Sequence, residues 1–250
     1  MSRLAAGPPT LEAVQGLHRR RRIRWPGGED VTTLVLWMQV GPLHVDLRLP
    51  ADLPDLAGAE GVEALPPDAL RALARCEGFA GTTTVEGGLC TWTRRVNWLG
   101  PSEPDIGRLE DTPEGLLETG VLADYEELWT REPPEGDGAR AARALTRPDG
   151  QFCILLREGP RFLMGRAAPE AMTAAPLAER LETALAARHR AAIARLLDME
   201  FCAGRLTPYG GVVEVSTLPF RKDAPAFVGD PWAEPAPRLA APGPWRDAAL

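Results

Sequence analysis

Residues 77–88 read EGFAGTTTVEGG, and residues 200–211 read EFCAGRLTPYGG. With Glu77 aligned to Glu200, six of the twelve positions are identical, including an Ala-Gly pair and a final Gly-Gly pair. Ordinary composition gives about one match over such a length, since even glycine makes up only about 7% of residues. The chain therefore repeats a segment that reads as a strand running into a tight turn.

The repeat extends to the hairpins that precede these segments. Gly41-Pro42 aligns with Gly159-Pro160 at an offset of 118 residues, whereas the two Ala-Gly pairs align at an offset of 123. The five-residue slip falls where the second half carries the longer helical segment. Each half, about 31–98 and 150–218, is thus predicted to form two strands, a helix and two more strands.

The strand segments are rich in β-branched and aromatic residues and are separated by glycine-containing turns. The Ala-Gly pair predicts a bend or bulge, where a second backbone comes too close for a larger side chain. Hairpins are expected where such runs flank a short turn. The expected strands are 31–39, 43–50, 78–86, 89–98, 123–131 and a hairpin over 150–166.

Two segments have helical spacing, and the regions outside the repeats look irregular. Residues 66–76 begin with proline, and residues 176–198 place leucines and an isoleucine on one side. The expected division is an N-terminal arm over 1–23, one domain over 24–222 with a linker at 131–149, and a Pro/Ala-rich tail over 223–250. Trp232 and Trp245 are expected to pin this tail to the surface.

Four-stranded units with one apolar face stand alone poorly, but two of them can close into a barrel without exposed edges. The sequence therefore predicts an all-β fold. The expected form is one antiparallel barrel of about ten strands built from the two pseudo-repeats, with a long helix at 176–198 packed outside.

Composition limits the classes of function. A net charge of −7 does not suit a protein that mainly binds nucleic acid. The longest apolar run, LVLWMQV at 34–40, is too short for a membrane span, and no signal peptide is visible. The four cysteines form no CxxC and do not cluster with histidine, so we expect buried thiols, a cytoplasmic location, no metal and no cofactor.

Several short motifs carry a family resemblance when taken in order. They are Asp46-Leu47-Arg48, Gly78-Phe79-Ala80-Gly81, Asp105-Ile106-Gly107, Leu109-Glu110 and Tyr125-Glu126-Glu127-Leu128-Trp129. This series resembles the lipocalin-like Hri family of fungal and bacterial proteins, over roughly residues 24–130 and only loosely beyond. The resemblance implies a calycin-type antiparallel barrel. It implies no established reaction and no defined catalytic residues.

Alternate residues of a strand share a face, and three strands have one mixed polar and aromatic face. In one interpretation the aliphatic faces fill the barrel and the polar faces are solvated. In the other, the polar-aromatic faces line an internal cavity and helices cover the aliphatic outside. The candidate ligand-binding residues of the second interpretation are Trp37, His44, Asp46, Arg48, Trp92, Arg94, Tyr125 and Glu127.

The row His44, Asp46 and Arg48 can bind an anion or a carbonyl oxygen, or support acid-base chemistry if His44 titrates near neutrality. The structural alternative is an internal ion pair of Asp46 with Arg48 or Arg94. Two charged groups are expected to be solvated: the run Arg19–Arg22 on the arm, and a loop carrying Asp105, Glu110, Asp111, Glu114 and Glu118.

Known catalytic motifs such as GxSxG, HExxH or a glycine-rich phosphate loop are absent from the sequence. We therefore expect a small-molecule-binding barrel for a partly apolar, anionic ligand. The alternative is a cofactor-independent barrel enzyme, such as an isomerase, cyclase or hydratase. A small molecule is the expected partner, with no nucleic acid and no membrane span, and a homodimer is left open.

Overall fold

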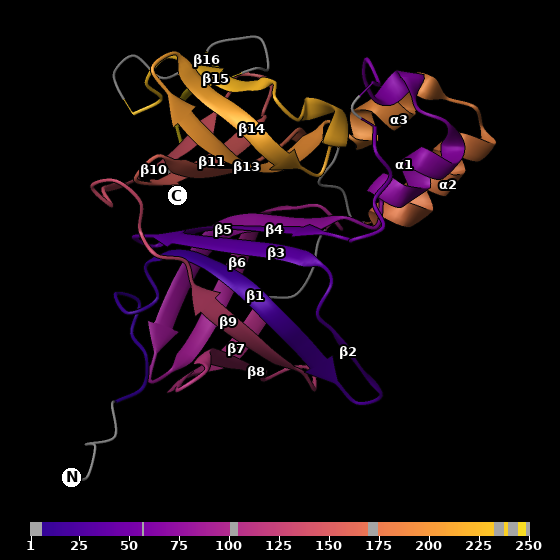
Figure 1. The fold of residues 1–250 in the computed structure, drawn as a ribbon. Coiled ribbons are helices and arrows are strands. Elements are labelled where there is room, and N and C mark those ends of the chain that lie inside the picture. The colour runs from indigo at the N-terminus through magenta and orange to yellow at the C-terminus, as the bar shows by residue number, and fades with distance from the viewer. Residues whose placement is uncertain are drawn as a thin grey trace.

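The computed structural model describes residues 7–56, 58–100, 105–169, 175–232, 238–239 and 245–248. In this part of the chain two antiparallel sheets lie one above the other, and three short helices cover one side of the pair (Figure 1). The expectation of a mostly β fold with a closed antiparallel barrel is confirmed.

The first sheet closes into a barrel. Its order is β2-β1-β3-β4-β5-β6-β7-β8-β9, and a further pairing of β1 with β9 makes a ring of eight of the described strands, with β2 outside it. Closure leaves the ring without a free edge. Its strands are β1 (Gly16–Trp25), β2 (Gly28–Asp30), β3 (Leu34–Val40), β4 (Leu43–Leu49), β5 (Glu77–Glu86), β6 (Leu89–Asn97), β7 (Asp105–Thr112), β8 (Gly115–Gly120) and β9 (Glu126–Arg131).

The second sheet is curled into a half-barrel, and no pairing among the described residues joins its two ends. Its order is β16-β15-β14-β13-β12-β11-β10-β17. Its strands are β10 (Arg140–Thr146), β11 (Phe152–Glu158), β12 (Arg161–Ala167), β13 (Met199–Thr207), β14 (Gly210–Ser216), β15 (Pro225–Val228), β16 (Arg238–Leu239) and β17 (Arg246–Asp247).

The expected single barrel of about ten strands is wrong, because each pseudo-repeat pairs within its own sheet. Segments that sequence reasoning set aside as irregular supply the strands that complete the sheets. β1 lies partly in the expected arm 1–23, β10 lies in the expected linker 131–149, and β15 to β17 lie in the expected tail 223–250. Residues 1–6 of the arm and much of the tail lie outside the described residues.

The two halves nevertheless have matching strand registers. Arg48 on β4 lies opposite Glu77 on β5, and Arg166 on β12 lies opposite Glu200 on β13, as the two sequence offsets require. In both halves the next pairing slips at the Ala-Gly pair, between Ala80 and Gly81 and between Ala203 and Gly204. The repeated unit of two strands, a helical segment and two strands is therefore visible in the backbone.

The bulge explains the glycines. A Cβ atom on Gly81 would lie 1.8 Å from the carbonyl oxygen of Thr93, and one on Gly204 would lie 2.0 Å from that of Val212. No side chain fits at such distances, so the close backbone approach expected from the sequence is confirmed.

The helical segments are shorter than expected. A 3-10 turn (Val62–Ala64) and α1 (Pro67–Leu73) join β4 to β5, while α2 (Leu177–Ala186) and α3 (Arg190–Leu196) join β12 to β13. The expected long helix over 176–198 is wrong, because the chain turns at Arg188, whose φ is +53°. The Arg188 and His189 amides donate to the Leu185 and Ala184 carbonyls, both at 3.0 Å, which ends α2.

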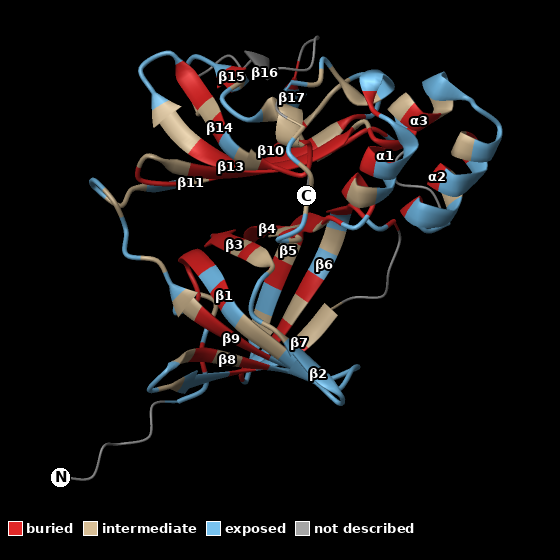
Figure 2. Cartoon of the chain, turned by 45° about the vertical axis from the view of Figure 1, so that its right-hand side comes forward, coloured by how far each residue is buried: buried red, intermediate tan, exposed pale blue. Residues whose placement is uncertain are grey.

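The main core lies between the two sheets. The outward face of β4, made of Leu43, Val45, Leu47 and Leu49, packs in one apolar cluster with residues of β11 to β13, such as Ile154 and Phe201. The facing strands are largely buried, whereas β2 is exposed (Figure 2). The aliphatic face is thus covered mainly by the second sheet, and α1, α2 and α3 cover its side.

A second apolar cluster fills the half-barrel. It contains Phe162, Phe227 and Trp245, and Trp232 packs against it. The tail is therefore anchored by its tryptophans, as expected, although they contribute to a core rather than to a surface. The four cysteines are free and buried, also as expected. Among the described residues, no helix is long and apolar enough to cross a membrane.

Candidate functional site

The polar and aromatic faces of the first sheet point into the barrel lumen. Trp37 on β3, Asp46 and Arg48 on β4, and Trp92 on β6 line one small cavity inside it. The leucines and the valine of β4 point the other way, into the core between the sheets. The polar faces thus point inward, as the second interpretation expected, but the second sheet rather than the helices mainly covers the aliphatic face.

The lumen cavity is small. Its volume is about 10 Å³, which is room for about one water molecule. Four further residues complete its wall: Phe79, Asp105, Glu118 and Trp129. This cavity is therefore too small for a ligand, because aromatic and charged side chains fill this part of the lumen.

Arg48 is the centre of a buried ionic network. Its Nε donates to Asp46 Oδ1 at 2.8 Å, and its Nη1 donates to Glu127 Oε1 at 3.4 Å. Arg20 Nη1 donates to the same Glu127 oxygen at 2.7 Å. The internal pair of Asp46 with Arg48, the structural alternative from the sequence, is thus present.

Arg94 and Arg48 both pack against the ring of Phe79. The guanidinium carbon of Arg94 lies 4.1 Å from the ring centroid, and that of Arg48 lies 5.3 Å from it. Arg94 Nη2 donates to Asp105 Oδ2 at 2.7 Å. Because the Arg48 and Arg94 side chains are 17% and 19% exposed, they lie where the lumen meets solvent.

Glu118 is a buried acid with neutral partners. Tyr125 Oη donates to Glu118 Oε1 at 2.8 Å, and Trp129 Nε1 donates to Glu118 Oε2 at 3.0 Å. Burial, and then the negative charge of Glu127, raise the pKa of Glu118 well above its usual value. Burial, and then Glu118 itself, raise the pKa of Tyr125. Glu118 therefore tends to hold a proton, as carboxyl groups in functional sites often do.

Asp46 is shifted in the same direction. Burial raises its pKa to about 6, although the positive charge of Arg48 acts against this shift. The lumen thus contains two carboxyl groups with a raised pKa, and three arginines lie close to them. The mixture is an unusual interior for a small barrel, since buried ion pairs often add little net stability compared with apolar packing.

His44 lies on the inward face of β4 but does not line the cavity. Its Nδ1 lies 2.9 Å from Thr83 Oγ1, and that hydroxyl donates to Gln39 Oε1. Nδ1 is therefore the protonated nitrogen, because the hydroxyl hydrogen is already used. Burial, and then the charge of Arg94, lower the pKa of His44 to about 3. A pKa this low disfavours the acid-base role that the sequence allowed if His44 titrated near neutrality.

Seven of the eight sequence-predicted residues belong to one connected site, and His44 lies beside it. Trp37 and Trp92 line the cavity, and their rings meet edge to face at 5.6 Å. Arg94 and Tyr125 join it through Asp105 and Glu118. The remaining members, described above, are Asp46, Arg48 and Glu127.

Sequence reasoning missed several residues of this site. Arg20, from the run expected on a solvated arm, is buried beside Glu127. Asp105 and Glu118, expected on a solvated loop, stand on β7 and β8. The sequence did contain a sign that Glu118 is buried. In a strand over 115–120 (GLLETG), Leu116 and Glu118 share one face, and that face is buried.

The two halves differ most in what fills them. At the sequence offset of 118, the lumen residues Trp37, His44 and Asp46 correspond to Leu155, Phe162 and Met164 of the half-barrel. Those three residues belong to its apolar interior cluster. The interior of the second copy is therefore more apolar than that of the first. It keeps one charged position, since Arg166, the counterpart of Arg48, pairs with the buried Glu200.

Several exposed apolar residues follow or end strands that finish at one end of the barrel. We call this end, where β1, β4, β6 and β8 finish, the mouth; Arg48 lies there. Large apolar residues that follow or end these strands are Trp25, Leu99, Val121 and Leu122, which are 45%, 41%, 49% and 67% exposed. Among the described residues, no histidine, cysteine and carboxylate cluster could hold a metal.

Comparisons with known proteins show the fold alone. No family model matches the chain, and no curated protein matches it. A solved structure, the uncharacterized protein YLR301w from Saccharomyces cerevisiae, is similar with a TM-score of 0.50 and 12% sequence identity. The match covers 81% of this chain and 85% of that one. The resemblance to the Hri family thus has a structural counterpart, while family membership is not established by sequence.

Proposed function

We propose that this chain is a small-molecule-binding protein whose site is the mouth of the first barrel. The observation that carries the proposal is the difference between the two interiors. The fold does not require His44 or Asp46 in the lumen, because the second copy of the same unit has Phe162 and Met164 at those positions. Arg48 has a charged counterpart, Arg166, which pairs with Glu200. Charged groups buried without a structural need are typical of functional sites.

The proposed ligand is partly apolar and anionic. Its anionic end would lie between Arg48 and Arg94, whose guanidinium groups stay charged and offer forked donors. Asp105, the partner of Arg94, has a side chain that is 24% exposed. A ligand carboxylate could share the Arg94 guanidinium with this carboxylate from the solvent side. The body of the ligand would then cover the exposed apolar residues at the mouth, since the lumen cavity admits only a water-sized group.

The alternative is a cofactor-independent isomerase, cyclase or hydratase. Glu118 favours it, because a carboxyl group with a raised pKa beside a water-sized cavity is a suitable general acid. A proton donor of this kind also serves a binding site as a hydrogen-bond donor. Binding is the simpler proposal, because it needs no reactive bond within reach of Glu118.

The test is native mass spectrometry of protein purified from its own host. We expect a retained mass that is lost on collisional activation, and lost from the Arg94→Gln variant. Arg95→Gln is the matched control, since Arg95 stands on the outer side of the same strand, where its guanidinium packs on Phe152. A bare chain, both as purified and after incubation with host metabolite extract, contradicts the proposal.

A further inference from the structure

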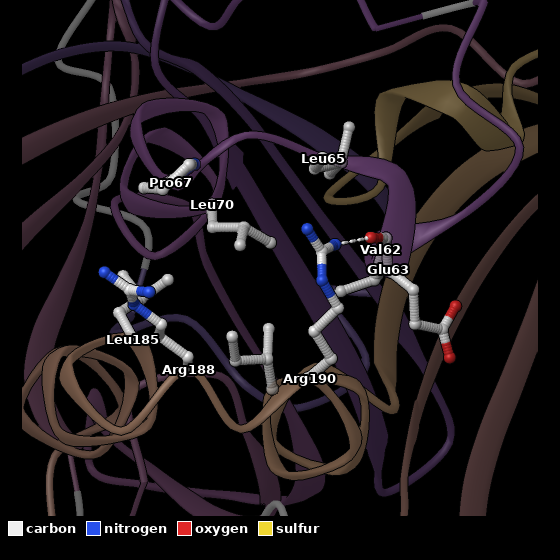
Figure 3. Close-up of a pocket in the computed structure, with 9 residues that line it drawn as sticks. Val62, Glu63, Leu65, Pro67, Leu70, Leu185, Arg188 and Arg190 are labelled. Atoms are coloured by element: carbon white, nitrogen blue, oxygen red, sulfur yellow. Dashed lines mark hydrogen bonds between the residues drawn. The ribbon is translucent and has the colours of Figure 1, made fainter.

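A second hollow, separate from the lumen, lies between the helical segments. The 3-10 turn and α1 form one side of it, and α2 and α3 form the other (Figure 3). Its volume is about 220 Å³. Its wall is largely apolar, with Leu65, Leu70, Leu185 and Ile193 among the lining residues.

Two arginines stand at opposite sides of this hollow. Arg188 enters from the end of α2 and Arg190 from the start of α3, with Leu70 between them (Figure 3). Arg190 Nη1 donates to the backbone carbonyl of Glu63. Among the described residues, no carboxylate lies within ion-pair distance of either guanidinium. The lining of the hollow thus combines apolar side chains with two guanidinium groups and one carboxylate, that of Glu63.

Arg188 occupies a backbone position that normally favours glycine. Its φ of +53° lies in the left-handed region, at the residue that ends α2. A side chain is unfavourable there, and such strain is often associated with function. The position is a loop between two helices, where a glycine would satisfy the turn. The turn therefore does not explain why an arginine rather than a glycine stands at position 188.

We propose that this hollow binds a monocarboxylate with a compact apolar tail. A dry apolar cavity of about 150 Å³ binds benzene, so 220 Å³ suits a tail of somewhat more atoms than a benzene ring. The carboxylate would pair with Arg188 at the rim, where a guanidinium can donate two parallel hydrogen bonds. Arg190, which stands at the other side and donates to the Glu63 carbonyl, adds positive charge. The site is independent of the barrel mouth and shares no residue with it.

Octanoate is the probe, because its tail is larger than benzene and its carboxylate can remain at the rim. Binding is measured on the full chain by isothermal titration calorimetry and by chemical-shift changes of the methyl groups of Leu70 and Ile193. We expect saturable octanoate binding. The neutral analogue octanol should bind at least tenfold more weakly, and octylammonium should not bind.

Three variants separate binding from folding. Val62→Trp places a large ring in the half-buried wall and should abolish octanoate binding. Arg188→Gly should weaken binding at least tenfold while keeping or raising the melting temperature, because glycine accepts the left-handed backbone. Arg195→Gln is the control. Arg195 is an exposed residue of α3 that lines a different hollow, so its loss should leave octanoate binding unchanged.

Any of three results overturns the proposal. The first is the absence of saturable octanoate binding to the wild-type chain. The second is equal binding of octanoate and octylammonium, since the two arginines then have no part in it. The third is unchanged octanoate affinity in a folded Val62→Trp variant, which would place the ligand elsewhere.

Discussion

Asp46 and Arg48 form the ion pair that the lumen depends on most directly. Arg48→Met would remove the donor that lies 2.8 Å from Asp46, a residue only 2% exposed. Breaking a buried pair costs about 3–5 kcal/mol. Because Arg48 is partly solvated and Asp46 protonates readily, we expect the lower end, about 3 kcal/mol, in urea denaturation at pH 7.

The double variant Asp46→Asn with Arg48→Met separates lost charge pairing from lost volume. It should recover part of the stability, since no uncompensated carboxylate remains, but it should not recover ligand binding. Arg95→Met, on the outer side of β6, should change the free energy of unfolding by less than about 1 kcal/mol. An Arg48→Met variant as stable as the wild type would mean that the network does not stabilise the fold.

His44 should make the fold sensitive to acid. Its folded pKa of about 3 lies below the unfolded value of about 6.5. Its contribution to stability is therefore complete above pH 6.5 and is lost as the pH falls toward 3. One proton corresponds to about 1.4 kcal/mol per pH unit, so the loss between pH 6.5 and 4.5 is roughly 2–3 kcal/mol.

His44→Gln removes the contribution of His44 to the pH dependence of stability. Urea titrations of both proteins at pH 7 and pH 4.5 would measure that contribution. We expect the variant to be less stable at pH 7 but to lose less stability on acidification. Burial lowers the pKa of His18 to about 4, so His18 also reduces stability in acid. It is unchanged in this variant, which therefore still loses some stability on acidification. Asp46 acts oppositely, since its raised pKa adds stability as the pH falls from about 6 toward 4. An equal acid loss in both proteins contradicts the assignment.

How far the site could be predicted depended on strand alternation. The inward set on β3, β4 and β6 followed from the period of two, but the sequence could not decide which face was inward. Arg20 escaped prediction because four successive arginines resemble a solvated arm, and nothing local indicates that β1 pairs with β9. Whether such a run is buried depends on strand pairing between residues far apart in the sequence, and composition does not show that pairing.

At the scale of elements, the bulge at the Ala-Gly pair is the most constrained feature of each half. Gly81→Ala would place a methyl group 1.8 Å from the Thr93 carbonyl oxygen, so the strands must separate. We expect a loss of about 3 kcal/mol in the free energy of unfolding, the upper end of ordinary substitutions. Gly204→Ala should behave alike, because its Cβ would lie 2.0 Å from the Val212 carbonyl oxygen.

Gly87→Ala is the matched control for these substitutions. Gly87 has a φ of +59° but no atom within 4 Å of an added Cβ, so only backbone strain applies. That strain costs about 1–2 kcal/mol. A Gly81→Ala variant no less stable than Gly87→Ala would show that the bulge relaxes easily.

The helical elements mark a limit of sequence reasoning. Leucine spacing over 176–198 continues through the break, because Ile193 and Leu196 also pack into the core. The usual signal of a helix end, glycine in the left-handed position, is missing, since Arg188 takes that position. Periodicity alone therefore predicted one helix where the chain forms two.

At the scale of the whole molecule, the duplication was predictable and the assembly was not. The two sequence offsets, 118 and 123 residues, relate the registers of the two halves. Joining them into one barrel was wrong because β1 and β7 to β9 complete the first ring by themselves. What joins the halves is face-to-face packing of sheets, and a repeat in sequence carries no information on which faces meet.

Phe201 shows how the two sheets are coupled. Its ring fits against Gly78 of the barrel and Gly165 of the half-barrel, where added Cβ atoms would lie 2.5 and 2.6 Å from ring carbons. Phe201→Ala would leave a cavity in the shared core, with an expected loss of about 3–5 kcal/mol. Because that core contains residues of both sheets, neither sheet keeps its buried face when the other unfolds.

The wild-type chain should therefore unfold in a single transition. In scanning calorimetry we expect the calorimetric and van't Hoff enthalpies to agree, as in two-state unfolding. Phe201→Ala should shift this one transition to lower temperature without dividing it. Two resolved transitions in the wild type, or one that moves while another stays, would mean that the halves are separate folding units. The apolar face of β4 would then be exposed to water once β11 to β13 had unfolded. Exposing such a face is unfavourable, so separate unfolding of the two halves is not expected.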